Sequence, residues 1–208
     1  MRAVIFDLDG TLIDAAPDIA LKLNEVLTAD GHAPLSLPEV RTMIGDGAKI
    51  LVERAFAARG RAMEPRHLEH LMDIYGKNPV IETVIYDGIL PTLEALKAEG
   101  RPLAICTNKP MHATREVLAA LDLTRFFGAV VGGDSTPYRK PDPRHLAAAL
   151  AGLEVTDAIM VGDHANDMKA AAGLGLPAIF CSWGYGEGVG EARADTPSEL
   201  PAIIARLG

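Results

Sequence analysis

Two aspartates near the start of the chain have the types and spacing needed for nucleophilic and acid–base chemistry. Asp7 and Asp9 follow the apolar run 3–6, and Gly10 comes directly after them. Because residues i and i+2 of an extended chain point the same way, both carboxylates can face one site where the strand ends. One carboxylate can then attack an electrophile while the other moves protons. Ordinary turn aspartates are the alternative, which the pattern Asp-x-Asp-Gly alone leaves open.

A second pair of aspartates lies in the segment 161–168. Asp163 follows another apolar run, and Asp167 comes four residues later, on the same face of an expected helix. Since Mg²⁺ prefers oxygen ligands, Asp163 joining Asp7 and Asp9 would build a magnesium site. Helix capping by Asp163 is the alternative interpretation, and it is compatible with metal binding.

Three further residues have side chains that suit an anionic group. Thr107 and Asn108 end another apolar run, and Lys140 precedes Pro141. A hydroxyl followed by free backbone N–H groups suits a phosphate oxygen, and a lysine supplies a compact positive charge. A lone threonine or lysine in a loop is usually solvated surface, so each residue is weak evidence by itself.

The elements that must position these residues alternate in type. Five short apolar runs bounded by turn residues predict buried strands over 3–6, 102–106, 128–131, 157–161 and 177–180. Helical patterns are expected over 90–98, 111–121, 143–150 and 166–172. This alternation predicts an α/β fold with a parallel sheet. The active site of such a sheet lies outside the carboxyl ends of its strands, where the polar clusters fall.

One long stretch breaks the alternation. Residues from about 16 to 81 show only helical patterns, which predict helices over 17–29, 38–43, 48–58 and 65–75. We therefore expect a helical cap domain, residues 15–83, inserted into a core domain of residues 1–14 and 84–208. Two crossings between the domains would let the cap open and close over the core.

Charge and composition exclude some classes of partner. The 208-residue chain has a formal net charge of −8 at pH 7, which argues against a nucleic-acid binder. The first residues lack a signal-peptide pattern, and no apolar stretch approaches the length of a membrane span. Cys106 and Cys181 fit reduced thiols. We expect a cytoplasmic protein that binds neither nucleic acid nor membranes, with monomer and homodimer both open.

Taken in order, four segments resemble the motifs of the haloacid dehalogenase superfamily. They are Asp-Leu-Asp-Gly-Thr-Leu at 7–12, Thr-Asn at 107–108, Lys-Pro at 140–141 and Gly-Asp-x-x-x-Asp at 162–167. The resemblance runs over nearly the whole chain. The helical insert is similar to the C1-type cap of that superfamily, and the segments 14–20, 45–48 and 86–88 resemble its phosphoglycolate phosphatase group.

The resemblance implies a fold and a set of catalytic roles. The fold would be a Rossmann-like parallel sheet core of order 5-4-1-2-3 with an inserted α-helical cap. Asp7 would be the nucleophile. Asp9 would protonate the leaving alcohol and then activate water. Lys140 would be the third catalytic residue, and Asp167 would orient it or a metal-bound water.

The resemblance also implies the binding residues. Mg²⁺ would be held by the carboxylate of Asp7, the backbone carbonyl of Asp9 and Asp163. The phosphoryl group would be held by Thr107 and Asn108 together with the lysine already named. These roles agree with the need of phosphoryl transfer for positioning and charge neutralisation.

Two loops have open interpretations. The loop 43–49, with Arg41 and Lys49 as its nearby cations, would contribute to substrate binding by the resemblance; a plain helix–helix turn with two surface cations is the alternative. Trp183 and Tyr185 follow the fifth strand and are expected to pack against the core, although a partner surface is an alternative.

The expected activity is Mg²⁺-dependent hydrolysis of a small phosphorylated metabolite, 2-phosphoglycolate, through an aspartyl phosphate. Another ester (a sugar phosphate, a nucleotide or pyrophosphate), a phosphomutase reaction and a catalytically silent binding protein are the alternatives. Dehalogenases of the superfamily lack the second aspartate, so Asp9 argues against that activity. Ile19 stands where the β-phosphoglucomutase group has a histidine, and this favours hydrolysis. The intact motif aspartates and lysine argue against a silent scaffold.

Overall fold

The apolar runs of the sequence form a six-stranded parallel sheet in the computed structural model, which describes residues 1–75 and 77–208. From edge to edge the strands are β5 (Ala129–Val131), β4 (Leu103–Cys106), β1 (Ala3–Phe6), β6 (Ala158–Gly162), β7 (Ala178–Cys181) and β8 (Ala192–Ala194). The expected α/β fold is confirmed, and the five expected strands keep the order 5-4-1-2-3. The strand β8, which no apolar run predicts, extends the sheet beyond the fifth.

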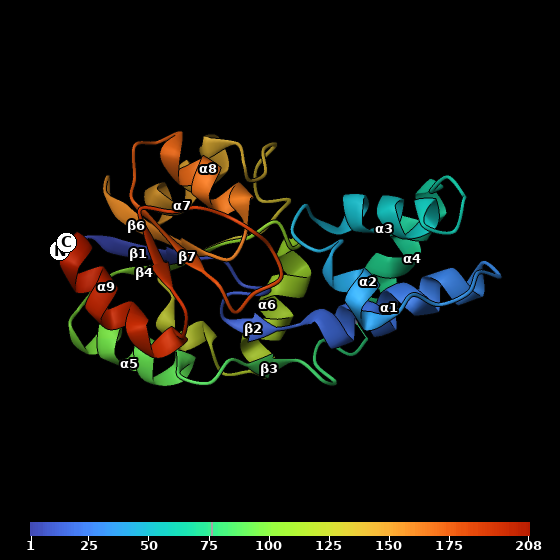
Figure 1. The fold of residues 1–208 in the computed structure, drawn as a ribbon, viewed down its shortest axis with the longest axis horizontal. Helices are drawn as coiled ribbons and strands as arrows, with labels where there is room; N and C mark the ends of the chain where they lie inside the picture. The colour runs from blue at the N-terminus through green and yellow to red at the C-terminus, as the bar shows by residue number, and fades with distance from the viewer. Residues whose placement is uncertain (76) are drawn as a thin grey trace.

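Both faces of the sheet are covered by helices (Figure 1). One face packs against α5 (Ile89–Ala98), α6 (Met111–Ala120) and α9 (Leu200–Leu207), and the other against α7 (Pro143–Gly152) and α8 (Ala165–Ala172). The four residues of β1 are all buried, and they alternate between the two apolar clusters. Burial on both faces explains why this strand is continuously apolar. Short 3₁₀ turns, η1 (Thr124–Phe126) and η2 (Pro197–Glu199), connect the outer elements.

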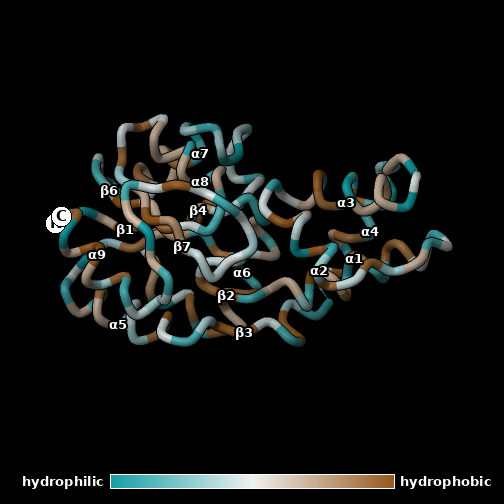
Figure 2. The backbone as a smooth tube through the Cα atoms, in the orientation of Figure 1, coloured by the Kyte–Doolittle hydropathy of each residue, from teal (hydrophilic) through white to brown (hydrophobic). Residues whose placement is uncertain are grey.

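Among the described residues, four helices follow the first strand and lie beyond the edge of the sheet where β1 ends (Figure 1). They are α1 (Ala16–Ala29), α2 (Leu37–Arg41), α3 (Ala48–Ala57) and α4 (Pro65–Tyr75). The apolar face expected for the first of them is buried, with Ile19, Leu23 and Val26 on it. Figure 2 shows apolar residues alternating with polar ones along these helices, whereas the central strands are apolar throughout. Amphipathic helices of this kind are stable only when packed on each other.

The chain crosses between the sheet and these four helices twice, and the crossings are joined to each other. The strand β2 (Ile13–Asp14) pairs antiparallel with β3 (Val84–Ile85). Asp18 accepts hydrogen bonds from the backbone N–H groups of residues 81–83 and from the Thr83 hydroxyl. Burial alone would raise the pKa of Asp18, but these hydrogen bonds lower it below its ordinary value. The two crossings are therefore bonded to each other by strand pairing and by the Asp18 side chain.

The loop after β7 packs onto the first crossing. The Tyr185 hydroxyl accepts a hydrogen bond from the Ala15 N–H at 2.8 Å and lies 2.8 Å from Asp14 Oδ1, to which it donates. The Trp183 indole N–H donates to the Thr11 carbonyl at 3.0 Å. The expected packing of both aromatic residues against the core is confirmed.

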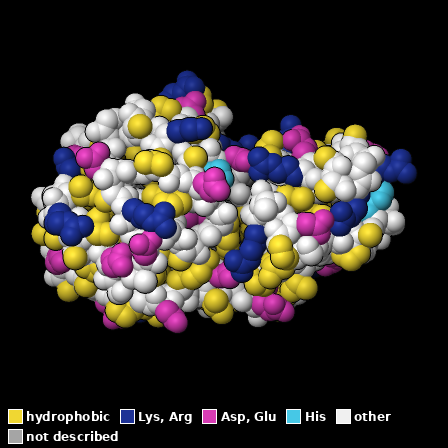
Figure 3. Space-filling view, viewed as in Figure 1, with side chains coloured by type: hydrophobic (Ala, Val, Ile, Leu, Met, Phe, Trp, Pro, Cys, Tyr) yellow, Lys and Arg dark blue, Asp and Glu magenta, His cyan; other side chains and the backbone are white. Residues whose placement is uncertain are grey.

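The surface carries mixed charge. Figure 3 shows acidic and basic side chains interspersed over the face in view, with no expanse of either sign. Among residues 1–75 and 77–208, none of the helices combines the length and the apolar character that crossing a membrane requires.

Candidate active site

Three neighbouring strands bring the predicted site residues to one place. Asp7 follows β1, Thr107 follows β4, and Asp163 follows β6, and these strands are adjacent in the order β4-β1-β6. Their carboxyl ends meet at the edge of the sheet that faces the inserted helices. The alternation of strands and helices thus places the polar clusters together, as it does generally in parallel sheets.

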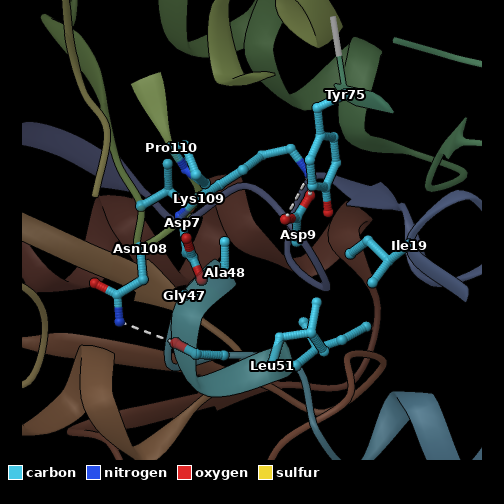
Figure 4. Close-up of a pocket in the computed structure, with 13 residues that line it drawn as sticks. Asp7, Asp9, Ile19, Gly47, Ala48, Leu51, Tyr75, Asn108, Lys109 and Pro110 are labelled. Atoms are coloured by element: carbon cyan, nitrogen blue, oxygen red, sulfur yellow. Dashed lines mark hydrogen bonds and ion pairs between the residues drawn. The ribbon is translucent and has the colours of Figure 1, made fainter. Parts of the chain in front are cut away.

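A small cavity lies between this edge and the inserted helices (Figure 4). The core contributes Asp7, Asp9 and the loop 107–110 to its lining. The inserted helices contribute Ile19, Ile44, Gly45, Gly47, Ala48, Leu51 and Tyr75. The cavity volume is about 40 Å³, which is the room of a few water molecules. The site is polar on one side and largely apolar on the other.

Lys140 forms the electrostatic centre of the core side. Its Nζ lies 3.0 Å from Asp7 Oδ1 and 2.5 Å from Asp167 Oδ1, and its side chain is only 2% exposed. Although burial alone would lower it, the charges of Asp167 and Asp7 raise the pKa of Lys140 above its ordinary value. The lysine is therefore held as a cation beside the carboxylate of Asp7, as the sequence predicts.

Three carboxylates converge next to this lysine. Oxygen atoms of Asp7, Asp163 and Asp167 lie within 4.8 Å of one another. Burial and the charge of Asp7 raise the pKa of Asp163 to about 6. Burial and the charges of Asp7 and Asp163 raise the pKa of Asp167 to about 7, against the attraction of Lys140. Mutual repulsion of this kind is what a cation between carboxylates relieves.

The donor set fits a divalent cation. Asp7 Oδ1 is buried and accepts no hydrogen bond from the described residues, although the lysine lies beside it. Converging, partly unsatisfied carboxylate oxygens are the ligands that Mg²⁺ takes in proteins. The carboxylate cluster contains Asp167 where the sequence prediction has Asp9; the predicted contribution of Asp9 is its backbone carbonyl.

Gly10 explains why Asp163 can lie so close to the first loop. Its φ is +85°, and a Cβ at this position would run into the Asp163 carboxylate. Only glycine fits such an approach without strain. The same carboxylate accepts hydrogen bonds from the Thr11 hydroxyl at 2.9 Å and from the Tyr185 N–H at 2.8 Å, which fix its orientation.

The Asp9 carboxylate makes an ion pair that the sequence reasoning missed. Lys109 Nζ lies 2.9 Å and 3.1 Å from its two oxygens (Figure 4). The lysine side chain is 4% exposed. Burial would lower the pKa of Lys109, but the charge of Asp9 outweighs burial and raises this pKa above its ordinary value. The sequence does indicate that Lys109 lies near the site, because it directly follows Thr107 and Asn108 at the strand end.

Asn108 connects three loops. Its amide N–H₂ donates to the carbonyls of Gly45 and Lys140, each at 2.9 Å, and its Oδ1 accepts from the Lys140 N–H. In this arrangement both amide hydrogens are used on backbone groups. The side chain thus positions Lys140 and the loop before α3, while Thr107 Oγ1 accepts from the Lys109 N–H at 3.2 Å.

The two cations expected to bind substrate from the inserted helices lie elsewhere. Arg41 pairs with Asp14 at 2.8 Å, at the crossing. Lys49 is 58% exposed and lies 3.6 Å from Glu53. Neither is among the described residues that line the cavity. The loop itself does reach the core, because Asp46 Oδ1 accepts a hydrogen bond from the Asn166 amide at 2.6 Å.

Comparison with known proteins agrees with this geometry. The model of the haloacid dehalogenase-like hydrolase family matches residues 1–175. The chain is 40% identical over 190 residues to a phosphoglycolate phosphatase of Caulobacter vibrioides, covering 88% of this chain and 80% of that protein. It is 41% identical over 198 residues to one of Rhodospirillum rubrum, with coverages of 88% and 80%. The crystal structure of a predicted phosphoglycolate phosphatase from Haemophilus somnus superposes with a TM-score of 0.90 at 29% identity, covering 98% of this chain and 97% of that one.

Proposed function

This chain is a phosphatase of the haloacid dehalogenase-like hydrolase family, and we propose that it hydrolyses 2-phosphoglycolate to glycolate and phosphate through an aspartyl phosphate on Asp7. The observation that carries the proposal is the buried Lys140, held between Asp7 and Asp167 and beside the Asp7 carboxylate that lines the cavity. A charged lysine beside a carboxylate can neutralise the phosphoryl oxygens that would otherwise repel the attacking group.

In the first step, an oxygen of Asp7 attacks phosphorus and the bond from phosphorus to the leaving oxygen breaks. Asp9 delivers a proton to that oxygen as the alcohol departs, since its carboxyl also lines the cavity. Lys140 stabilises the charge on the transferred group, and the Thr107 hydroxyl is free to donate to one of its oxygens because its Oγ1 only accepts from the Lys109 N–H.

In the second step, water attacks phosphorus of the aspartyl phosphate. Asp9 takes a proton from that water, and the bond between the Asp7 oxygen and phosphorus breaks to release phosphate. Mg²⁺, held by Asp7, Asp163 and the Asp9 carbonyl with Asp167 beside them, would supply further neutralisation of phosphoryl charge. The chain's own contribution is to fix Asp7 and Asp163 at strand ends and to hold Lys140, from the loop before α7, between Asp7 and Asp167.

The size of the cavity supports a small substrate. The cavity has a volume of about 40 Å³, so any ester requires the inserted helices to move apart, and a sugar or a nucleoside requires a larger movement than 2-phosphoglycolate. The relatives with about 40% identity carry the name phosphoglycolate phosphatase. Ile19 lines the cavity and has no group that can exchange a proton with a sugar hydroxyl, which favours hydrolysis over a phosphomutase reaction.

We further propose that residues 15–83 act as a cap that opens to admit substrate and closes for the reaction. Contacts from Gly45 and Asp46 to Asn108 and Asn166 hold the closed arrangement. The paired strands β2 and β3 form its hinge. Closure over the cavity would exclude water from the first step.

The direct test is phosphate release from a panel of small esters with Mg²⁺ and with EDTA. The panel contains 2-phosphoglycolate, hexose phosphates, a nucleoside monophosphate and pyrophosphate. The proposal expects metal-dependent turnover with the highest kcat/KM for 2-phosphoglycolate. A higher kcat/KM for another ester would overturn the substrate while leaving the mechanism, and full turnover in EDTA would overturn the role of Mg²⁺.

A further inference from the structure

The cavity is lined by a lysine, Lys109, for which phosphoryl transfer gives no use. Lys140 already serves the phosphoryl group, whereas Lys109 is paired with Asp9 by both carboxylate oxygens. Of the described residues that line the cavity, Lys109 is the only one with a positive charge. Burying an ammonium group is costly, so a lysine kept 4% exposed inside a substrate cavity calls for a functional reason.

The surroundings of Lys109 leave it able to exchange partners. Lys140 is fixed between two carboxylates, but the only carboxylate that contacts Lys109 among the described residues is Asp9. Its other neighbour is Tyr75 of α4, whose ring centroid lies 5.3 Å from Nζ (Figure 4). An aromatic face attracts the ammonium group without forming a directional bond. A substrate anion entering the cavity can therefore replace Asp9 while the ring stays in place.

The position of Lys109 identifies which part of a substrate it can meet. Asp9 is the group that protonates the leaving oxygen in the proposed mechanism, and Lys109 lies against Asp9 on the side of the inserted helices. The leaving group is the part of the ester that extends from phosphorus past Asp9. A negative charge one or two carbon atoms beyond the leaving oxygen would lie next to Lys109.

We propose that Lys109 recognises a carboxylate on the leaving group of the substrate, and that by pairing with this carboxylate it releases Asp9 for proton transfer. This inference rests on the proposed function and specifies which residue selects the substrate. An ester without the second charge leaves Lys109 on Asp9. Charge on the leaving group therefore promotes turnover itself and not only binding, so the preference appears in kcat as well as in KM.

A matched pair of substrates tests this assignment. 2-Phosphoglycolate and 2-phosphoglycolamide have nearly the same size, but the amide lacks the second charge. Wild-type protein is expected to show a lower kcat and a higher KM with the amide. A hydrogen bond to a charged group contributes roughly 1.5–3 kcal/mol, so the kcat/KM ratio of acid to amide is expected to be roughly ten- to a hundredfold.

Variants locate the selectivity. Lys109→Met is expected to bring the acid-to-amide ratio close to one, and Lys109→Arg to keep part of it because the charge remains. Lys169→Met is the matched control. Lys169 is exposed on α8 and does not line the cavity, so this substitution removes the same charge from the core without changing the cavity. The control is expected to keep the wild-type ratio, with circular dichroism melting confirming that each variant is folded.

The outcomes separate the failure of this inference from the failure of the proposed function. A wild-type protein that turns over the acid no better than the amide would overturn the proposed substrate, and the role of Lys109 with it. A wild-type preference that survives in folded Lys109→Met would overturn the role of Lys109 alone. If that variant does not fold, the wild-type kcat values decide, because equal kcat for acid and amide contradicts the release of Asp9.

Discussion

The core side and the cap side of the cavity are lined by different types of residue. The core presents carboxylates at strand ends and two lysines from loops, of which Lys140 pairs with two carboxylates. The inserted helices present Ile19, Leu51 and Tyr75 with backbone from the loop around Gly45. The difference separates two tasks. In the proposed reaction the core holds the groups that react, and the inserted helices limit the size of the substrate and exclude water.

Lys109 and Lys140, the two buried lysines that pair with active-site carboxylates, show the same difference on a smaller scale. Lys140 comes from the core loop before α7 and contacts only core carboxylates. Lys109 also comes from the core, but it lies between Asp9 and the cap residue Tyr75. A lysine with two carboxylates is held rigidly, whereas one between a carboxylate and a ring can respond to the substrate and to the cap.

The largest effect is expected from Lys140→Met. Removing this charge should lower kcat about 10²- to 10³-fold, which is the usual loss when one group that stabilises transition-state charge is removed. The loss should be equal for 2-phosphoglycolate and its amide, because Lys140 contacts the phosphoryl group common to both. Steady-state kinetics on the two esters measure it. A loss confined to the acid would mean that the two lysines do not divide their tasks as the geometry indicates.

A smaller effect on activity is expected on the cap side. Leu51→Ala enlarges the cavity, so kcat/KM for 2-phosphoglycolate should fall while that for larger esters rises relative to it. Because Leu51 is buried, the variant should also lose about 2–5 kcal/mol of stability. Leu37→Ala on α2 is the control, since Leu37 is exposed and lies outside the cavity lining. An unchanged substrate ranking in Leu51→Ala would contradict the role of the cap in limiting size.

The hinge that joins the two regions can be tested through Asp18. Asp18→Asn removes a charged acceptor for the N–H groups of residues 81–83, and we expect a loss of about 2 kcal/mol at pH 7. The folded pKa lies below the ordinary value of 3.8, so this stability is present above that value and disappears as the pH falls through the folded pKa.

The measurement is chemical denaturation of wild type and Asp18→Asn as a function of pH. The difference between them should narrow below about pH 4. Asp73→Asn is the control, since Asp73 is exposed on α4. A difference that stays constant down to the acid transition would show that the carboxylate charge of Asp18 does not fasten the hinge.

The smallest effect is expected from Lys49→Met. Lys49 is 58% exposed and pairs with Glu53 rather than facing the cavity, and exposed ion pairs contribute only about 0.2–1 kcal/mol. We expect kcat/KM to change by less than about twofold. A tenfold rise in KM would restore the sequence-based expectation that this cation binds substrate, and it would show that the cap acts through charge as well as shape.

The sequence predicts the core better than the cavity's finer contacts, for a physical reason. Apolar runs bounded by turns determine strands, and strand ends of a parallel sheet must meet, so Asp7, Thr107 and Asp163 could be placed together from local pattern alone. The strand β8 is three residues with an arginine in the middle, and such a short edge strand leaves no apolar run to detect.

The pairing of Lys109 with Asp9 could not be predicted in the same way. The two residues are 100 positions apart, and the position of Lys109 just after Thr107 and Asn108 places it near the site without identifying Asp9 as its partner. Arg41 and Lys49 are close to the cap loop in sequence, yet neither is among the described residues that line the cavity. Sequence position alone does not determine which carboxylate a long cationic side chain contacts. Arg41 instead joins Asp14 at the hinge.

The measurement that tests the central claim most directly is trapping of the covalent intermediate. Wild-type protein is mixed with 2-phosphoglycolate carrying a ³²P label and Mg²⁺, quenched in acid during turnover and digested for peptide mass analysis. The account predicts one labelled phosphoryl group on the peptide that contains Asp7, and no label and no turnover in folded Asp7→Asn. Full turnover by Asp7→Asn, or a label on another residue, would contradict the assignment of Asp7 as the nucleophile.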